Sequence, residues 1–177
     1  MKHPSLLKKT VSLGILLTAL QGIPQGAMAA NAGQSAATPA VPELINPGQF
    51  KWQKTIPQLG DRSPEYAILH ADTETGLTTL MFRTPVAVHI KPHTHARAET
   101  HVVLVGGTHV FASEGVRYDI ENGGFFRAPG GVVHEAWLPA GSQTFNILES
   151  GWVVDWINGG PSAEDVDQYP PKSTGKR

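Results

Sequence analysis

Residues 89–106 read HIKPHTHARAETHVVLVG, and this stretch decides how the whole chain is interpreted. It holds four of the chain's eight histidines together with one glutamate, Glu99. Side chains two residues apart on a β-strand lie on the same face, so His93 and His95 point the same way, with Cα atoms about 6.6 Å apart. Two imidazole rings that converge on one point favour a metal site over a histidine-rich surface without a function.

The residues that follow His95 supply further candidate ligands. Residues 96–98 are long enough to turn the chain, so that Glu99 opens the next strand and faces the same centre. A fourth ligand has to come from elsewhere, and His134 is the candidate because it follows a tight-turn signal, Pro129-Gly130-Gly131. The expected metal ligands are therefore His93, His95, Glu99 and His134.

This donor set suits one divalent transition metal, namely Fe, Mn, Ni, Cu, Zn or Co. With one glutamate, a divalent ion keeps a net charge of about +1, which favours anionic oxygen ligands such as carboxylates and enolates. If the ion is octahedral, four protein ligands leave two positions open. A bidentate substrate, or a substrate together with dioxygen, could occupy them.

The middle of the chain is a series of short apolar runs separated by Gly, Pro and Asp. These runs are rich in Val, Ile, Thr and aromatic residues, and one occurs about every 8–12 residues. The spacing predicts an all-β sandwich or barrel, and Gly106-Gly107 between two runs predicts a hairpin turn. The predicted strands are 66–72, 77–83, 86–91, 100–105, 109–113, 124–128, 132–138, 144–149 and 152–157.

The spacing of the candidate ligands resembles the two sequence motifs of the cupin superfamily. Two positions depart from the motifs, because Ala87 stands where the first opens with glycine and Leu138 stands where the second ends with asparagine. Eight positions match in residue type and offset: His93, His95, Glu99 and Gly106 in the first motif, and Gly123, Pro129, Gly131 and His134 in the second.

The resemblance implies a single-domain, cupin-type jelly-roll β-barrel with the metal inside it and frequent pairing into homodimers. More narrowly, the chain is similar to small exported single-domain cupins. The superfamily includes dioxygenases, decarboxylases, isomerases, and sugar-binding and regulatory modules. The resemblance therefore predicts the fold and the four ligands but leaves the activity open.

Other residues are candidates for the surroundings of the metal. His101 lies two residues after Glu99 and shares its face, so it is either a catalytic proton carrier or a hydrogen-bonded core histidine. Arg127 could clamp a substrate carboxylate. Phe82 and Trp137 belong to an aromatic set that forms core or lines an apolar substrate pocket.

The remaining histidines and one aromatic run carry weaker expectations. His89 has the parity of the ligands but is expected to be structural, at the far end of the barrel, and His109 is expected to be exposed after a turn. Glu135 should face away from the metal. The residues Trp152, Val154 and Trp156 share one face, which would be a dimer seam if it lies outside the barrel.

The two ends of the chain differ from this middle part. Residues 1–29 combine a basic start, a short apolar run and Ala27-Met28-Ala29, which is typical of a cleaved secretory signal peptide. Their apolar run is about half the length of a membrane span, so no stable span is expected after cleavage. Residues 30–48 are predicted to be a flexible lead-in, 49–160 the barrel and 161–177 a polar tail. The predicted location is periplasmic or secreted.

The composition excludes several classes of function. The chain has 14 Lys and Arg against 15 Asp and Glu. Cleavage removes three lysines, Lys2, Lys8 and Lys9, and leaves 11 basic against 15 acidic residues, so there is no basic patch for nucleic acid. The chain has no cysteine, which excludes disulfides and thiolate catalysis.

The favoured hypothesis is an exported metalloenzyme of dioxygenase type that acts on a small anionic or enolic molecule. One alternative is a non-catalytic module, structural or binding a small molecule, in which zinc completes a closed four-ligand site. Another is a lyase or isomerase that uses the ion only as a Lewis acid. Loading of the metal after export favours zinc, because zinc and copper outcompete iron and manganese by affinity.

Overall fold

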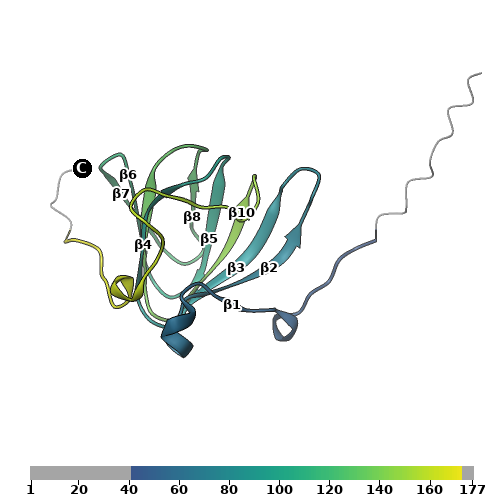
Figure 1. Ribbon diagram of the computed structural model, residues 1–177, viewed down its shortest axis with the longest axis horizontal. Coiled ribbons are helices and arrows are strands. Elements are labelled where there is room, and N and C mark those ends of the chain that lie inside the picture. The colour runs from purple at the N-terminus through teal and green to yellow at the C-terminus, as the bar shows by residue number, and fades with distance from the viewer. Residues whose placement is uncertain (1–40, 173–177) are drawn as a thin grey trace, which may run out of the picture. The chain divides into compact units, whose positions relative to one another are not determined.

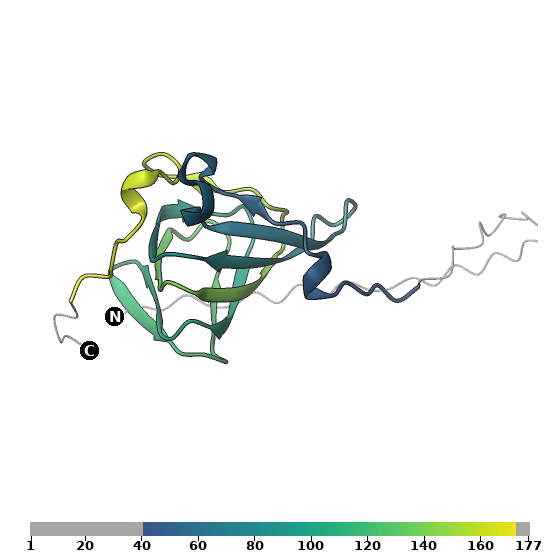
Figure 2. The same cartoon turned by 90° about the horizontal axis from the view of Figure 1, so that it is seen from below.

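The computed structural model describes residues 41–172. The predicted signal peptide, residues 30–40 of the predicted lead-in, and residues 173–177 lie outside the described residues. From Glu43 onward the chain forms two antiparallel sheets that curve around a common interior (Figures 1 and 2). The prediction of an all-β jelly roll is confirmed, and among the described residues the only helical segments are 3-10 turns, η1 (Pro47–Gln49), η2 (Pro57–Arg62) and η3 (Ala163–Asp165).

The first sheet has six strands in the order β1-β2-β3-β10-β5-β8, and the second has five in the order β11-β4-β9-β6-β7. The first contains β1 (Gln53–Lys54), β2 (Glu65–Ala71), β3 (Thr78–Thr84), β10 (Ser142–Leu148), β5 (Glu99–Val105) and β8 (Phe125–Ala128). The second contains β11 (Asp155–Trp156), β4 (Val88–Thr94), β9 (His134–Leu138), β6 (His109–Ser113) and β7 (Val116–Ile120).

The core fills the space between the sheets because the strands alternate inward and outward side chains. On β9, His134, Ala136 and Leu138 are buried while the residues between them are half-buried. On β10 the same alternation buries Ser142, Thr144, Asn146 and Leu148. The largest apolar side chains of the core are Leu80, Phe82, Val88, Phe111, Phe126, Leu138 and Leu148.

The predicted hairpin at Gly106-Gly107 is wrong, because the strands on either side of it do not pair. β5 belongs to the six-stranded sheet and β6 to the five-stranded sheet, so the two glycines carry the chain across from one sheet to the other. Gly106 has φ +111°, and a Cβ atom there would lie 2.3 Å from the Cα atom of Ser142. Glycine is required here by a close backbone approach.

Residues 161–172 begin with a segment that packs on the domain, although the whole of 161–177 was expected to be a polar tail. Asp165 of η3 is buried and its carboxylate lies 3.1 Å from Lys91 Nζ. Val166 joins the core and pairs with Val88 through an isolated bridge. Further along, the Pro171 carbonyl accepts a hydrogen bond from Arg117 Nη1 at 2.6 Å.

None of the helices among residues 41–172 has the length and apolar character that crossing a bilayer requires.

Candidate metal centre

Three strands and one loop bring the four predicted ligands together. His93 lies on β4 directly opposite His134 of β9. The pairing of β4 with β9 is irregular between Ile90 and His93, where Pro92 has no N–H to donate to its neighbour. His95 follows β4, and Glu99 opens β5 in the facing sheet.

The loop before His134 docks directly on the loop that carries His95. The Gly131 N–H donates a hydrogen bond to the His95 carbonyl oxygen at 2.8 Å. A Cβ atom on Gly130 would lie 2.8 Å from both the Ala96 carbonyl oxygen and the Arg97 Cα atom. Glycine therefore allows the close contact that places His134 beside the other ligands.

The four candidate ligands form one buried cluster. One possible ligand atom from each residue lies within 4.8 Å of those of the other three. Each residue is at most 5% exposed. Such a group of polar side chains is costly to bury unless a cation or hydrogen bonds satisfy it.

Backbone carbonyls orient the three imidazole rings. Their Nδ1 atoms donate to carbonyl oxygens, which leaves the Nε2 lone pairs available toward the cluster. The Nδ1 atoms of His93, His95 and His134 lie 2.7, 2.7 and 3.0 Å from the carbonyl oxygens of Lys91, Val153 and Val132.

Glu99 lies at the centre of the histidines. Its Oε2 atom is 2.9 Å from His95 Nε2, 3.0 Å from His101 Nε2 and 3.4 Å from His134 Nε2. Burial raises the pKa of the Glu99 carboxyl, but its electrostatic and hydrogen-bonding interactions with His101, and then those with His134 and His95, outweigh burial and hold that pKa well below its usual range. Glu99 is therefore a carboxylate at neutral pH.

The pKa values of His93 and His95 depart from the usual value in opposite directions. Burial, followed by the nearby charge of His134, lowers the pKa of His93 to about 4, so its ring is neutral at pH 7. Burial also acts to lower the pKa of His95, but its interactions with Glu99 win and raise that pKa. His95 Nε2 is buried without a well-directed hydrogen-bond partner among the described residues. Because the Nδ1 protons are directed at backbone carbonyls, the cluster has too few protons for hydrogen bonds between its ring nitrogens and the Glu99 carboxylate. A divalent cation would satisfy these atoms.

His101 and Asn146 extend the cluster on the side of the six-stranded sheet. His101 of β5 lies opposite Asn146 of β10, and their Nδ1 and Nδ2 atoms are 2.9 Å apart. Asn146 Nδ2 also lies 3.4 Å from Glu99 Oε1. The sequence analysis predicted that His101 shares a face with Glu99 but missed Asn146. The signal for Asn146 was a polar residue at an inward position of the alternating run 144–149.

A cavity of about 70 Å³ opens beside the cluster. Its polar lining comes from the four candidate ligands, His101, Asn146 and Thr55. Its apolar lining consists of Phe82, Ile90, Phe111, Ala136, Leu138, Trp152, Val154, Trp156 and Pro161. The face shared by Trp152, Val154 and Trp156 therefore points into the cavity, so it is not an outer seam for a second copy.

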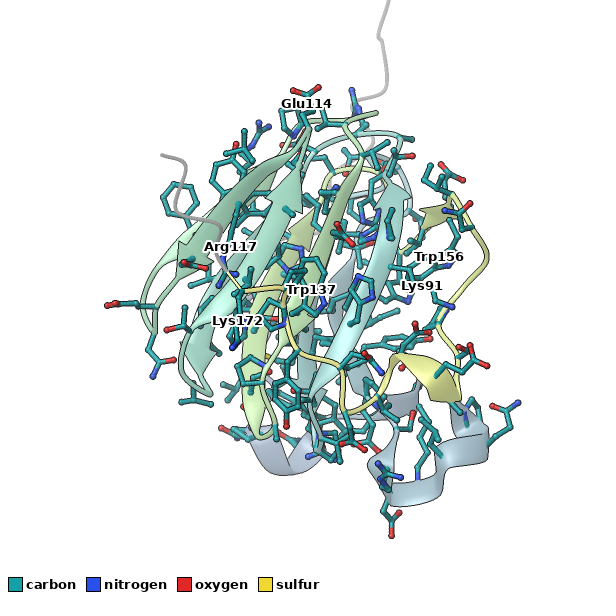
Figure 3. All side chains as sticks on the ribbon, turned by 90° about the vertical axis from the view of Figure 1, so that its left-hand side faces the viewer. Lys91, Glu114, Arg117, Trp137, Trp156 and Lys172 are labelled. Atoms are coloured by element: carbon teal, nitrogen blue, oxygen red, sulfur yellow. The ribbon has the colours of Figure 1, made fainter. Side chains whose placement is uncertain are left out.

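Of the three predicted pocket residues, only Phe82 lines the cavity. Trp137 lies on the outer face of the five-stranded sheet, where its ring stacks on that of His89 with centroids 4.5 Å apart (Figure 3). It points outward because Ala136 and Leu138 occupy the inward positions of β9. Arg127 is also outside, half-exposed, with Nη2 3.0 Å from Glu149 Oε1.

The structure corrects two further expectations about histidines. The irregularity at Pro92 breaks the alternation of β4, so Ile90 faces the cavity while His89 faces outward. The Nε2 atom of His89 lies 2.8 Å from Glu135 Oε2, and Glu135 faces away from the metal centre as predicted. His109 was expected to be exposed but is fully buried, because the crossover places it two residues before Phe111 on the inward face of β6.

Comparison with known proteins agrees with the fold. A family model described as the ChrR cupin-like domain matches residues 41–149. No curated protein matches the chain.

Similar solved structures include an RmlC-like cupin from Shewanella frigidimarina (16% identity, TM-score 0.53, covering 63% of this chain and 94% of that one). Another is KdgF from a Halomonas species (17% identity, TM-score 0.51, covering 61% and 94%). A third is an acetylacetone dioxygenase from Acinetobacter johnsonii (17% identity, TM-score 0.50, covering 63% and 75%). At these identities the likeness shows the fold alone.

Proposed function

Since the chain belongs to the ChrR cupin-like family, we propose that it is a metal-dependent enzyme whose substrate is a small organic anion or enol bound directly at the metal. The observation that carries this proposal is the cavity beside the four buried donors. Structural zinc sites are closed by their protein ligands, whereas catalytic sites keep a position open for water or substrate. Donors that line a cavity support the second type.

The residues of the proposed centre have separate roles. The ion would be held by His93, His95, Glu99 and His134. The backbone carbonyls of Lys91, Val153 and Val132 keep the three imidazole rings oriented. A divalent ion held there supplies a Lewis acid, and a redox-active one also supplies electrons for a reaction with dioxygen. We favour dioxygen as co-substrate because the cavity walls beside the donors are largely apolar, which suits a small apolar molecule.

His101 is the proposed catalytic residue. It lines the cavity, and its Nε2 atom is 3.0 Å from Glu99 Oε2. The side chain of Asn146 contacts its Nδ1 atom and fixes the orientation of the ring. From this position His101 can take a proton from an acidic C–H or O–H group of the bound substrate and return it to the product.

The place where the protein works is proposed from the sequence. The signal-peptide pattern of residues 1–29 supports a periplasmic or secreted location. The cupin resemblance supports pairing into homodimers, although Trp152, Val154 and Trp156 face the cavity and cannot form the interface.

A closed zinc site is the second candidate. All four donor atoms lie within 4.8 Å of one another, which also suits a four-coordinate ion. In that case the protein would be a binding or structural module without catalysis.

Metal analysis of the protein purified from its native compartment separates the two candidates. We expect about one equivalent of iron, manganese, nickel or copper per chain, with a bound water that exchanges with solvent. Stoichiometric zinc without an exchangeable water would exclude the oxygenase and support the closed module. The control is His95→Ala, which should retain no metal in the same purification.

A further inference from the structure

We infer that the ligand of this centre carries one negative charge, located on its metal-binding end, and otherwise has a small apolar body. This inference rests on the proposed function and adds the substrate class to it. Three features of the cavity support it: the lack of a second cation, the net charge of the centre, and the composition and size of the walls.

Among residues 41–172, the cavity offers no lysine or arginine to pair with a second acidic group. The nearest chain neighbours of the lining residues are already engaged on the outside. Lys91, next to Ile90, is paired with Asp165 at 3.1 Å, and Lys54, next to Thr55, is paired with Asp61 at 3.1 Å.

The charges of the centre balance with a single anion. A divalent ion with Glu99 and three neutral imidazoles leaves a net charge of about +1. A monoanionic ligand neutralises this charge. A dianion would leave an uncompensated negative charge against a buried apolar wall, which is strongly unfavourable.

The walls select for apolar groups of limited size. Trp152, Trp156, Val154 and Leu138 form much of the apolar wall, and Leu138 occupies the position where the cupin motif has asparagine. One water needs roughly 10–15 Å³ of such volume. The cavity of about 70 Å³ therefore holds roughly five to seven groups of that size, too few for a sugar acid or a nucleotide.

A matched set of 2-oxo acids on the Co(II)-loaded chain tests the charge. These probes share one metal-binding end, and binding is followed by the visible absorption of the cobalt. We expect 2-oxobutanoate to bind, and 2-oxoglutarate to bind about 100-fold more weakly because of its second carboxylate. The control for length is 2-oxohexanoate, which is apolar and should bind at least about tenfold more tightly than 2-oxoglutarate. Equal affinity for 2-oxoglutarate and 2-oxohexanoate would overturn the inference.

A charge introduced at the cavity wall should reverse this preference. Val154 lines the cavity and is half-buried, whereas its neighbour Val153 points outward and is 58% exposed. We expect Val154→Lys to tighten the binding of 2-oxoglutarate by at least about tenfold, because the long side chain can bring its ammonium group to the second carboxylate. Val153→Lys is the matched control and should change nothing. No tightening in a folded, cobalt-loaded Val154→Lys would count against the inference.

Size is tested with phenylpyruvate, which carries the same metal-binding end and a bulky ring. It should bind weakly to the wild type and at least about tenfold more tightly to Trp152→Ala, whereas Trp137→Ala on the outer face should have no effect. Wild-type protein that binds phenylpyruvate as tightly as 2-oxobutanoate would contradict the size limit. If no probe binds while cobalt is stoichiometric, the proposed function itself fails, and this inference fails with it.

Discussion

At the scale of single residues, the centre depends on histidines whose two ring nitrogens have different partners. Each candidate imidazole binds a backbone carbonyl through Nδ1, which leaves Nε2 available to the cluster of ligands. Burial then prevents water from satisfying those nitrogens, so a cation has to do so. His89 differs from these ligands. It lies on β4, as His93 does, but it pairs with Glu135 on the outer surface.

We expect His95→Ala to lower metal affinity by at least about 100-fold, since loss of a ligand should cost more than loss of a supporting contact. Metal should raise the melting temperature of the wild type, because it ties separate strands together, but should have no such effect on the variant. Isothermal titration and thermal unfolding with and without chelator measure both. His89→Ala is the control and should bind metal normally. A wild-type melting temperature that is the same with and without chelator would contradict this prediction.

His109 predicts a pH dependence of stability. It is fully buried, and burial lowers its pKa from 6.5 to about 4. Between these values the unfolded chain binds the proton and the folded chain does not, so stability should fall as the pH drops from about 6.5 toward 4. The loss attributable to this residue is about 3 kcal/mol.

Urea unfolding of the wild type and of His109→Leu over this pH range checks the prediction. The difference in unfolding free energy between the two should shift in favour of the variant as the pH falls. His70→Leu, at an exposed histidine, should track the wild type. Parallel pH profiles for wild type and His109→Leu would show that His109 is not held neutral.

At the scale of elements, the contact between two loops assembles the site. The turn before β9 lies against the loop between β4 and β5, through the Gly131–His95 hydrogen bond and the close approach at Gly130. This contact connects His134 to ligands that lie 35 to 41 residues earlier in the chain. The segment 151–161, which contains β11, supplies further residues of the cavity wall. Its Val153 carbonyl orients His95.

We expect Gly130→Ala to weaken metal binding by at least about tenfold, although residue 130 is not a ligand. The added methyl group would lie 2.8 Å from backbone atoms of residues 96 and 97, so the two loops must separate and move His134. Metal titration of the purified variant measures this. Gly48→Ala is the control, because a Cβ atom there meets no atom within 4 Å. Wild-type affinity in Gly130→Ala would show that the loop contact does not position the ligand.

At the scale of the whole molecule, sequence patterns predicted the features that depend on residues close together in the chain. Several features that depend on which strands pair were not predicted correctly. Most strands, and the inward face shared by Glu99 and His101, follow from alternation, although β1 and β7 were not predicted. The motif offsets identified the four residues that come together. Simple alternation failed for His89, because the irregularity at Pro92 reverses the faces of β4.

Other errors arose where the fold, rather than the local sequence, sets the environment. The chain crosses from one sheet to the other at Gly106-Gly107. This crossover explains both why the two glycines do not form a hairpin and why His109 is buried. The sequence cannot tell which face of 152–157 is inside, nor which face of β9 carries Trp137, until the strands are paired. Asn146 was missed because its partner, His101, lies on a different strand.

The most direct test of the central claim is anomalous diffraction from crystals of the metal-loaded chain, recorded at the absorption edge of the bound ion. We predict one strong peak about 2.0–2.2 Å from the Nε2 atoms of the three histidines and from a carboxylate oxygen of Glu99. The peak should disappear in crystals of His134→Ala. A peak bound by His70 or His89 at the surface, or a buried peak that does not contact His134, would contradict the account.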